Sequence, residues 1–206
     1  FAMNSGETGI TAVVLAAGLG RRMGEEATKQ LLPWGKRTVL GQTLFNLQQS
    51  AANELMVVSG HERVAVEAIA HQMGIVTQFN PQFATGEMLS SLKTAVSQLG
   101  GHVTAVLVVL ADQPMVEPTT YDQIMQPHRA TQTMLVAPQN NGCRGNPVLI
   151  GRPHYGELLS LPANAAPRHL LQRHQTALKL IPVHTDSIHR DLDTPEAYEK
   201  WRPKTG

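Results

Sequence analysis

Two long apolar runs, both rich in β-branched residues, constrain the fold of this chain more than any other feature. They are ITAVVLAA at residues 10–17 and VTAVLVVLA at residues 103–111. Neither run alternates between polar and apolar residues, so each predicts a strand that is buried on both faces. A sheet built on such strands needs a layer of helices on each side.

Helix-like and strand-like segments alternate along the rest of the chain. Helices are predicted at 38–51, 62–74 and 86–100, and short strands at 54–60 and 75–79. Beyond the central strand at 103–111, we expect a helix from about 118, strands at 133–138, 145–151 and 177–183, and helices at 155–161, 168–174 and from 195. Pro147 limits its strand to a sheet edge, or to starting at that residue. The alternation predicts an α/β fold, a Rossmann-like three-layer sandwich with a mostly parallel mixed sheet, in one domain over 1–206.

Composition excludes several classes of protein. The chain has 17 basic and 16 acidic residues, a net charge of +1, which argues against a nucleic-acid-binding surface. Its single cysteine, Cys143, excludes an internal disulfide and a thiolate zinc site and favours a reducing compartment. No apolar run reaches the ~18 residues of a membrane span, and because the first residues show no charged segment followed by an apolar one, we expect no secretory signal. We therefore expect a cytoplasmic protein. Phe1 and Ala2 precede Met3 and are interpreted as a cloning remnant.

A glycine-rich loop follows the first strand, in LAAGLGRRMGEEATKQLLPWG. Two familiar phosphate-binding patterns fail on it. The dinucleotide pattern G-x-G-x-x-G fits at Gly18 and Gly20 but has Met23 in place of the third glycine, and the P-loop pattern lacks its G-K-[ST] ending. The second predicted strand also ends without an acidic residue to hold a ribose.

What remains is a long loop that carries Arg21, Arg22 and Lys29 before Pro33. Glycines allow backbone N–H groups to approach phosphate oxygens, and the cations balance their charge. The loop therefore favours a triphosphate site, with Arg21 pointing to solvent. The simpler interpretation is a solvated basic loop in which the glycines serve only as turns.

Acidic residues stand at two places where strands and helices meet. Asp112 directly follows the most apolar strand, where it either faces phosphates or caps the turn at Pro114. In the segment HRDLDTPEAY, Asp193 or Thr194 is a natural helix N-cap, and we assign the cap to Asp193, which leaves Asp191 for a metal. If Asp112 and Asp191 converge, they form an oxygen site suited to Mg²⁺, with Asp193 as a further possible ligand.

Four segments together resemble the MobA-like branch of the nucleotidyltransferases. They are the LAAGLGRRMG…KQ loop, TGEMLSSLKTAV, LADQPMV and DLDTPEAY, which occur in the family's order from about Thr11 to Tyr198. The resemblance implies the nucleotide-diphospho-sugar transferase type of fold, a catalytic Mg²⁺, and metal ligation by Asp112 and Asp191. It also implies that Lys29 contacts the α-phosphate and Arg22 the β- and γ-phosphates.

Within this branch, the chain is most similar to the molybdenum cofactor cytidylyltransferases. Related guanylyltransferases show L-A-G-G where this chain has Ala17, so Ala17 and segment 86–91 point to CTP. The implied reaction transfers CMP from CTP to the phosphate of molybdopterin and releases pyrophosphate. The cofactor would then pass to an apoenzyme of the xanthine dehydrogenase family. The implied nucleotide-binding residues are Leu15, Ala16, Ala17, Gly18, Gly20, Arg22, Lys29, Gly86, Ser90 and Ser91.

The segment expected to bind the acceptor departs from the family pattern. The family usually shows G-H-P where this chain has Gly145, Asn146 and Pro147, so Asn146 replaces a histidine. Arg168 either contacts the acceptor's phosphate or begins a helix. Three alternatives therefore stay open: use of GTP, a sugar or alditol phosphate as acceptor, and a non-catalytic cofactor carrier. The nine histidines include no H-x-x-x-H pair, and we expect none of them to bind a metal.

Overall fold

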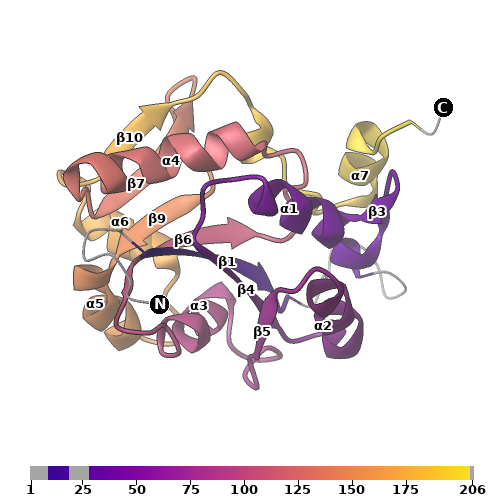
Figure 1. Cartoon of the computed structure of the whole chain (residues 1–206), viewed down its shortest axis with the longest axis horizontal. Coiled ribbons are helices and arrows are strands. Elements are labelled where there is room, and N and C mark those ends of the chain that lie inside the picture. The colour runs from indigo at the N-terminus through magenta and orange to yellow at the C-terminus, as the bar shows by residue number, and fades with distance from the viewer. Residues whose placement is uncertain (1–8, 19–27, 205–206) are drawn as a thin grey trace, which may run out of the picture.

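The computed structural model describes residues 9–18 and 28–204. Its main element is an eight-stranded sheet with the strand order β10-β7-β9-β6-β1-β4-β5, to which β8 adds by pairing with β7 (Figure 1). The strands are β1 (Gly9–Ala16), β4 (Glu54–Ser59), β5 (Val76–Phe79), β6 (Val103–Leu110), β7 (Leu135–Asn140), β8 (Cys143–Arg144), β9 (Val148–Gly151) and β10 (Lys179–Pro182).

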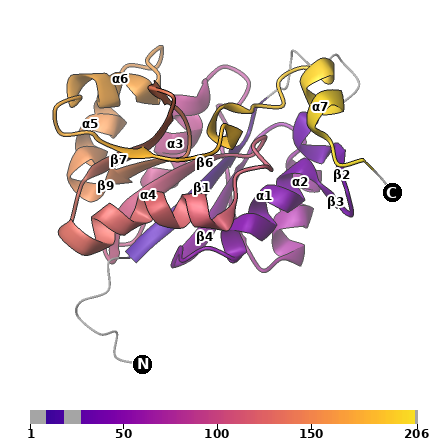
Figure 2. The ribbon, with the colours of Figure 1, turned by 90° about the horizontal axis from the view of Figure 1, so that it is seen from above.

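Helices cover both faces of this sheet, as the buried strands require (Figure 2). One face packs against α1 (Val39–Gln48), α2 (Arg63–Gln72) and α4 (Pro118–Thr131). The other face packs against α3 (Met88–Val96), α5 (Tyr155–Ser160) and α6 (Pro167–Arg173). In β1, Ala12 and Val14 belong to the first core and Val13 to the second, and none of the three is exposed. The chain thus folds as the predicted Rossmann-like three-layer sandwich.

The register of the central strands sets where their ends lie. β1 pairs in parallel with both β4 and β6, and Leu15 stands opposite Val58 and Leu110. The carboxyl ends of the three strands are therefore level, and residues just after them emerge at one edge of the sheet.

The strand that contains the predicted segment 145–151 takes an interior place. β9 lies between β6 and β7 and runs antiparallel to both. Pro147 directly precedes the first paired residue, Val148, so it removes no ladder hydrogen bond. The strand-start interpretation of Pro147 is confirmed, and the edge interpretation is wrong.

A small hairpin and the last helix pack together beside the sheet. The hairpin joins β2 (Pro33–Trp34) to β3 (Arg37–Thr38), neither of which the sequence patterns predicted, and α7 (Pro195–Trp201) packs against it. The Tyr198 hydroxyl donates to the Pro33 carbonyl oxygen at 2.6 Å. Within residues 9–18 and 28–204, no helix combines the length and the hydropathy needed to cross a membrane.

Candidate functional site

A cavity of about 570 Å³ opens at the carboxyl ends of β1 and β6. This is the edge at which the parallel α/β architecture places ligands. Its lining comes from these strand ends, from the segment after β5 and from two segments far apart in sequence, which are the start of the 3₁₀ helix η2 (Lys29–Leu31) and the stretch before α7. The lining residues are Leu15, Ala17, Gly18, Lys29, Gln30, Phe83, Ala84, Thr85, Gly86, Glu87, Met88, Ser91, Leu110, Ala111, Asp112, Asp191 and Asp193.

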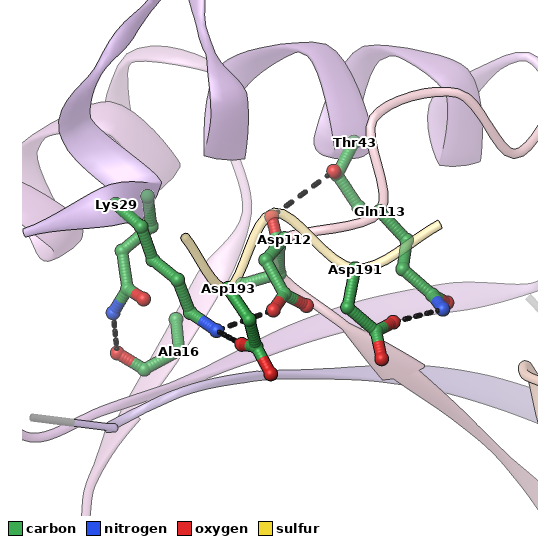
Figure 3. A network of polar contacts seen from close by, with 9 residues as sticks. Ala16, Lys29, Thr43, Asp112, Gln113, Asp191 and Asp193 are labelled. Carbon is green, nitrogen blue, oxygen red and sulfur yellow. Dashed lines mark hydrogen bonds and ion pairs between the residues drawn. The ribbon is translucent and has the colours of Figure 1, made fainter. Parts of the chain in front are cut away.

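Lys29 joins two carboxylates in this cavity. Its Nζ lies 2.5 Å from an oxygen of Asp112 and 2.5 Å from an oxygen of Asp193 (Figure 3). Burial by itself lowers the pKa of Lys29, but the charges and hydrogen bonds of Asp112 and Asp193 outweigh it and raise that pKa above its usual value. Lys29 is therefore a fixed positive charge at the carboxyl end of β6.

Asp191 lies beside this ion-paired group and has a different partner. Gln113 Nε2 donates to Asp191 Oδ1 at 2.6 Å (Figure 3). The pKa of Asp191 is raised, first by desolvation and then by the negative charge of Asp112. By surface area the Asp191 side chain is nevertheless exposed, so water screens this repulsion and keeps the effect modest.

The structure corrects the assignment of the helix cap before α7. Thr194, not Asp193, is the N-cap, and its hydroxyl accepts from the Ala197 backbone N–H at 3.2 Å. Asp193 instead extends to Lys29. The reason is that Thr194 immediately precedes Pro195 at the first helical position, so Asp193 lies one residue too early to reach the first turn.

The segment after β5 is built around a buried amide. Asn80 is fully buried and donates through Nδ2 to the hydroxyls of Ser90, at 2.8 Å, and Ser91, at 3.0 Å. A Cβ added to Gly86 would lie 2.5 Å from the Ser90 side chain and 3.0 Å from the Gln82 carbonyl oxygen. Only glycine therefore fits where this segment closes on α3.

Most of the nucleotide-binding residues expected from the sequence lie around the one cavity. Ala16 and Ser90 are not among the lining residues. Ala16 is buried, and its carbonyl oxygen accepts from Gln30 Nε2 at 2.6 Å, while Ser90 hydrogen-bonds within the 80–90 segment. Gly20 and Arg22, together with Arg21, lie outside the described residues.

The segment expected to bind the acceptor does not line this cavity. The Asn146 backbone N–H donates to the Ile188 carbonyl oxygen at 3.1 Å, in the short 3₁₀ helix η4 (Ser187–His189). A Cβ on Gly145 would lie 2.4 Å from the same oxygen. Pro147 is buried beside them. Arg168 is exposed as the second residue of α6, which agrees with its alternative role as the beginning of a helix.

Three amide side chains contribute to the site although the sequence patterns did not point to them. Gln30, Asn80 and Gln113 are each at most 2% exposed, and each makes a hydrogen bond that positions a cavity segment. Two of them carried a usable signal. Asn80 follows β5 directly, and Gln113 follows Asp112 after β6, so both are polar residues at the carboxyl ends of apolar strands.

The three carboxylates offer only oxygen atoms, which are the donors that Mg²⁺ and similar hard cations prefer. Within the described residues, Asp112, Asp191 and Asp193 do not form a group whose ligand atoms all lie within 4.8 Å of one another. A protein site for Mg²⁺ commonly uses one or two carboxylates and completes its shell with water and substrate phosphates. The residues present therefore fit such an ion without a third protein ligand.

Comparison with known proteins supplies the family. The model of the MobA-like NTP transferase domain matches residues 12–178. Molybdenum cofactor cytidylyltransferase from Escherichia coli K12 is 26% identical over 92% of this chain and 93% of its own length. Nicotine blue oxidoreductase from Paenarthrobacter nicotinovorans is 30% identical over 91% of this chain and 93% of its own.

Solved structures agree with this assignment. The crystal structure of Rv0371c from Mycobacterium tuberculosis superposes with a TM-score of 0.80 at 30% identity, covering 94% of this chain and 97% of that one. A further structure of Rv0371c is a complex with manganese, with a TM-score of 0.79 at 27% identity and coverage of 96% and 100%. The family model spans most of the sheet and the strand ends around the cavity, and the chain belongs to the MobA-like NTP transferase family.

Proposed function

We propose that this nucleotidyltransferase is a Mg²⁺-dependent cytidylyltransferase. It would transfer CMP from CTP to the phosphate of a molybdopterin-type cofactor and release pyrophosphate. The observation that carries the proposal is Lys29 held between Asp112 and Asp193 at the carboxyl end of the sheet. The similarity to molybdenum cofactor cytidylyltransferase supports the choice of base and acceptor.

In the proposed reaction, an oxygen of the acceptor phosphate attacks the α-phosphorus of CTP. The bond from that phosphorus to the bridging oxygen of the β-phosphate breaks, and pyrophosphate leaves with the electron pair. The acceptor phosphate is already an anion near neutral pH, so the step needs no general base. The main barrier is the approach of two anions, which fixed positive charge lowers.

Lys29 would supply that charge at the α-phosphate. Its ammonium group is in place before any nucleotide arrives, held by two carboxylates, so little reorganisation is needed. Asp112 and Asp191 would hold Mg²⁺, and Asp193, which contacts Lys29, would be a further candidate ligand. When bound, Mg²⁺ supplies Lewis-acid stabilisation of charge on the phosphate oxygens.

The acceptor side rests on a different set of contacts. Gln113 Nε2 lies 3.4 Å from the Ile188 carbonyl oxygen, which also accepts from the Asn146 backbone. Gln113 further donates to Asp191. We therefore assign Gly145, Asn146 and Pro147 to an acceptor region, which hydrogen bonds of Ile188 and Gln113 connect to Asp191. Contact of Arg168 with the acceptor stays a prediction.

One relative is named as an oxidoreductase, so a redox function has to be weighed against nucleotidyl transfer. Cleavage of a triphosphate uses a bound metal ion and a fixed positive charge, which the carboxylates and Lys29 can supply, whereas a redox step does not depend on this combination. A non-catalytic cofactor carrier has no need for it either. The geometry around Lys29 therefore favours nucleotidyl transfer. We place the reaction in the cytoplasm, with a molybdenum hydroxylase apoenzyme of the xanthine dehydrogenase family as recipient.

The test is pyrophosphate release with CTP, GTP, ATP or UTP, each with Mg²⁺ and molybdenum cofactor. We expect release with CTP only, and none when Mg²⁺ is withheld. Release with GTP alone would reverse the base assignment. Release with CTP and a sugar or alditol phosphate, but not with molybdenum cofactor, would replace the acceptor. Tight cofactor binding without release from any nucleotide would favour the carrier.

A further inference from the structure

A cluster of side chains that could hold a metal ion lies away from the cavity lined by Lys29 and Asp112, which we call the nucleotide cavity. It consists of His154, Glu157 and His174, whose potential ligand atoms all lie within 4.8 Å of one another. In the part of the chain that the structure describes, it is the one group of three such residues that meets this distance. None of the three lines the nucleotide cavity.

Rigid elements bring these residues together. His154 ends the 3₁₀ helix η3 (Arg152–His154), and Glu157 follows three residues later in the first turn of α5, so both share one helix face. His174 follows the last residue of α6. The buried Leu158 of α5 and Leu170 of α6, both 0% exposed, fix these two helices against the sheet.

The start of this segment is also tied to the sheet. Arg152 Nε donates to the Val103 carbonyl oxygen at 2.6 Å, at the amino end of β6. The cluster therefore lies near the end of the sheet opposite to the nucleotide cavity. In both ribbon views, α5 and α6 lie on the other side of the molecule from α7 (Figures 1 and 2).

The three side chains already contact one another. His174 Nε2 lies 2.6 Å from Glu157 Oε2, and the His154 and His174 rings meet edge to face with their centroids 4.6 Å apart. The other carboxylate oxygen, Glu157 Oε1, accepts from Arg173 Nη1 at 3.2 Å. A simple ion pair would explain Glu157 with His174, but it gives no reason for a second imidazole beside them.

The donor set selects a different ion from the nucleotide site. Two imidazole nitrogens and one carboxylate oxygen suit Zn²⁺ and similar borderline cations, whereas Mg²⁺ prefers oxygen alone. Ligands on one tetrahedral Zn²⁺ lie about 3.3 Å apart, given metal–ligand distances of roughly 2.0–2.2 Å. Small side-chain rotations would open the 2.6 Å contact and draw the remaining atoms in to that spacing.

We propose that His154, Glu157 and His174 form a second metal site, which binds Zn²⁺ and clamps the start of α5 to the end of α6. Arg173 would orient the carboxylate through its second oxygen, as outer-shell partners of metal ligands do. The side chains of Glu157 and His174 are 31% and 34% exposed, so an ion can reach them from solvent. Water would complete the coordination.

The test uses the full chain without a polyhistidine tag, stripped of metal and titrated with Zn²⁺ in excess Mg²⁺, which would fill the proposed site at Asp112 and Asp191. We expect one equivalent of Zn²⁺ to bind. His154→Ala and His174→Ala should each weaken binding by about 100-fold or more, since even loss of an outer-shell partner costs 10–100-fold. Glu157→Gln, which keeps the shape of the side chain, should also weaken it.

Two matched controls locate the ion. His184→Ala removes an exposed histidine elsewhere and should leave Zn²⁺ affinity unchanged, as should Asp112→Asn in the nucleotide site. Wild-type protein should also gain thermal stability with Zn²⁺, and the His154 and His174 variants should not. The proposal is overturned if those two variants bind Zn²⁺ like wild type, if Asp112→Asn abolishes binding, or if wild type binds none. The outcome does not depend on nucleotidyl transfer.

Discussion

At the scale of single residues, Lys29 is the group on which the proposed chemistry depends. It is the lysine that the structure places between two carboxylates at the strand ends. Replacing it with alanine removes the fixed positive charge and leaves Asp112 and Asp193 to repel each other. We expect Lys29→Ala to lower the rate of pyrophosphate release by about 10²–10³-fold, the usual effect of removing one preorganised charge-stabilising donor.

The matched control is Lys36→Ala, which removes an exposed lysine in the β2–β3 hairpin. It should retain the wild-type rate. Equal rates for the two variants in the pyrophosphate assay would remove Lys29 from the mechanism.

Asp191 should show a separation between stability and activity. Its raised pKa means that the folded protein holds the protonated form more readily than the unfolded chain does. The ionised carboxylate therefore lowers the stability of the fold once the pH rises above the ordinary pKa of an aspartate. The full loss of stability is reached when the pH exceeds the raised pKa of Asp191 in the folded protein. Asp191→Asn removes that charge and keeps an oxygen for Gln113. We expect an unchanged or slightly higher Tm near neutral pH, no such gain under acid conditions, and loss of Mg²⁺-dependent activity.

Thermal melts at acid and neutral pH, run beside the pyrophosphate assay, measure both effects. A fall of several degrees in Tm at neutral pH would contradict the account of Asp191. It would mean that the Asp191 carboxylate stabilises the fold and is not kept, at a cost in stability, for binding a metal.

At the scale of elements, the α7 helix carries the acidic segment to the lysine. Thr194 caps α7, and its loss should cost about 1 kcal/mol. In a chain of this length, such a loss lowers Tm by roughly 2–4 °C. We expect Thr194→Ala to show this shift and to reduce activity as well, because the cap adjoins Asp193. Thr194→Ser keeps a capping hydroxyl and should restore both Tm and activity; failure of serine to restore them would argue against the cap.

The segment between β5 and α3 makes a second prediction at this scale. A methyl group at Gly86 would collide with Ser90 and press on Gln82, so Gly86→Ala must shift this part of the cavity lining. We expect a higher KM for the nucleotide. Gly101→Ala is the control, because nothing lies within 4 Å of its added Cβ. Steady-state kinetics with varied CTP compare the two, and an unchanged KM in Gly86→Ala would separate this segment from nucleotide binding.

At the scale of the whole molecule, a ligand that binds only the folded state must stabilise it. With CTP and Mg²⁺ together at about 100 times the dissociation constant, stability rises by roughly 2.7 kcal/mol, or about 5–10 °C in Tm. We expect much less with CTP when Mg²⁺ is absent, because among the described lining residues Lys29 alone would then have to balance the negative charges of the triphosphate, Asp112 and Asp191. An equal shift with and without Mg²⁺, in a thermal-shift assay, would contradict a metal-dependent site.

The amino-acid sequence by itself determined the layers of this protein and the edge at which its site lies. Runs such as 103–111 can be buried on both faces only between two helical layers, and in parallel sheets the residues that follow strands gather at one edge. Asp112 was predictable for that reason, whereas the assignment of the α7 cap to Asp193 was wrong and the structure places that cap at Thr194. The layers, the edge and the position of Asp112 depend on periodicity and on immediate neighbours, which a sequence displays directly.

Only the tertiary structure decided which distant residues meet. Lys29 and Asp193 are 164 positions apart, and they meet beside the place where α7 packs on the β2–β3 hairpin. Likewise, His154 and His174 show no metal-binding spacing in the chain, and two helices bring them together. The interior place of β9 has the same origin. Contacts of this kind depend on how whole elements pack, and packing energy is shared among many residues, so no local pattern records them.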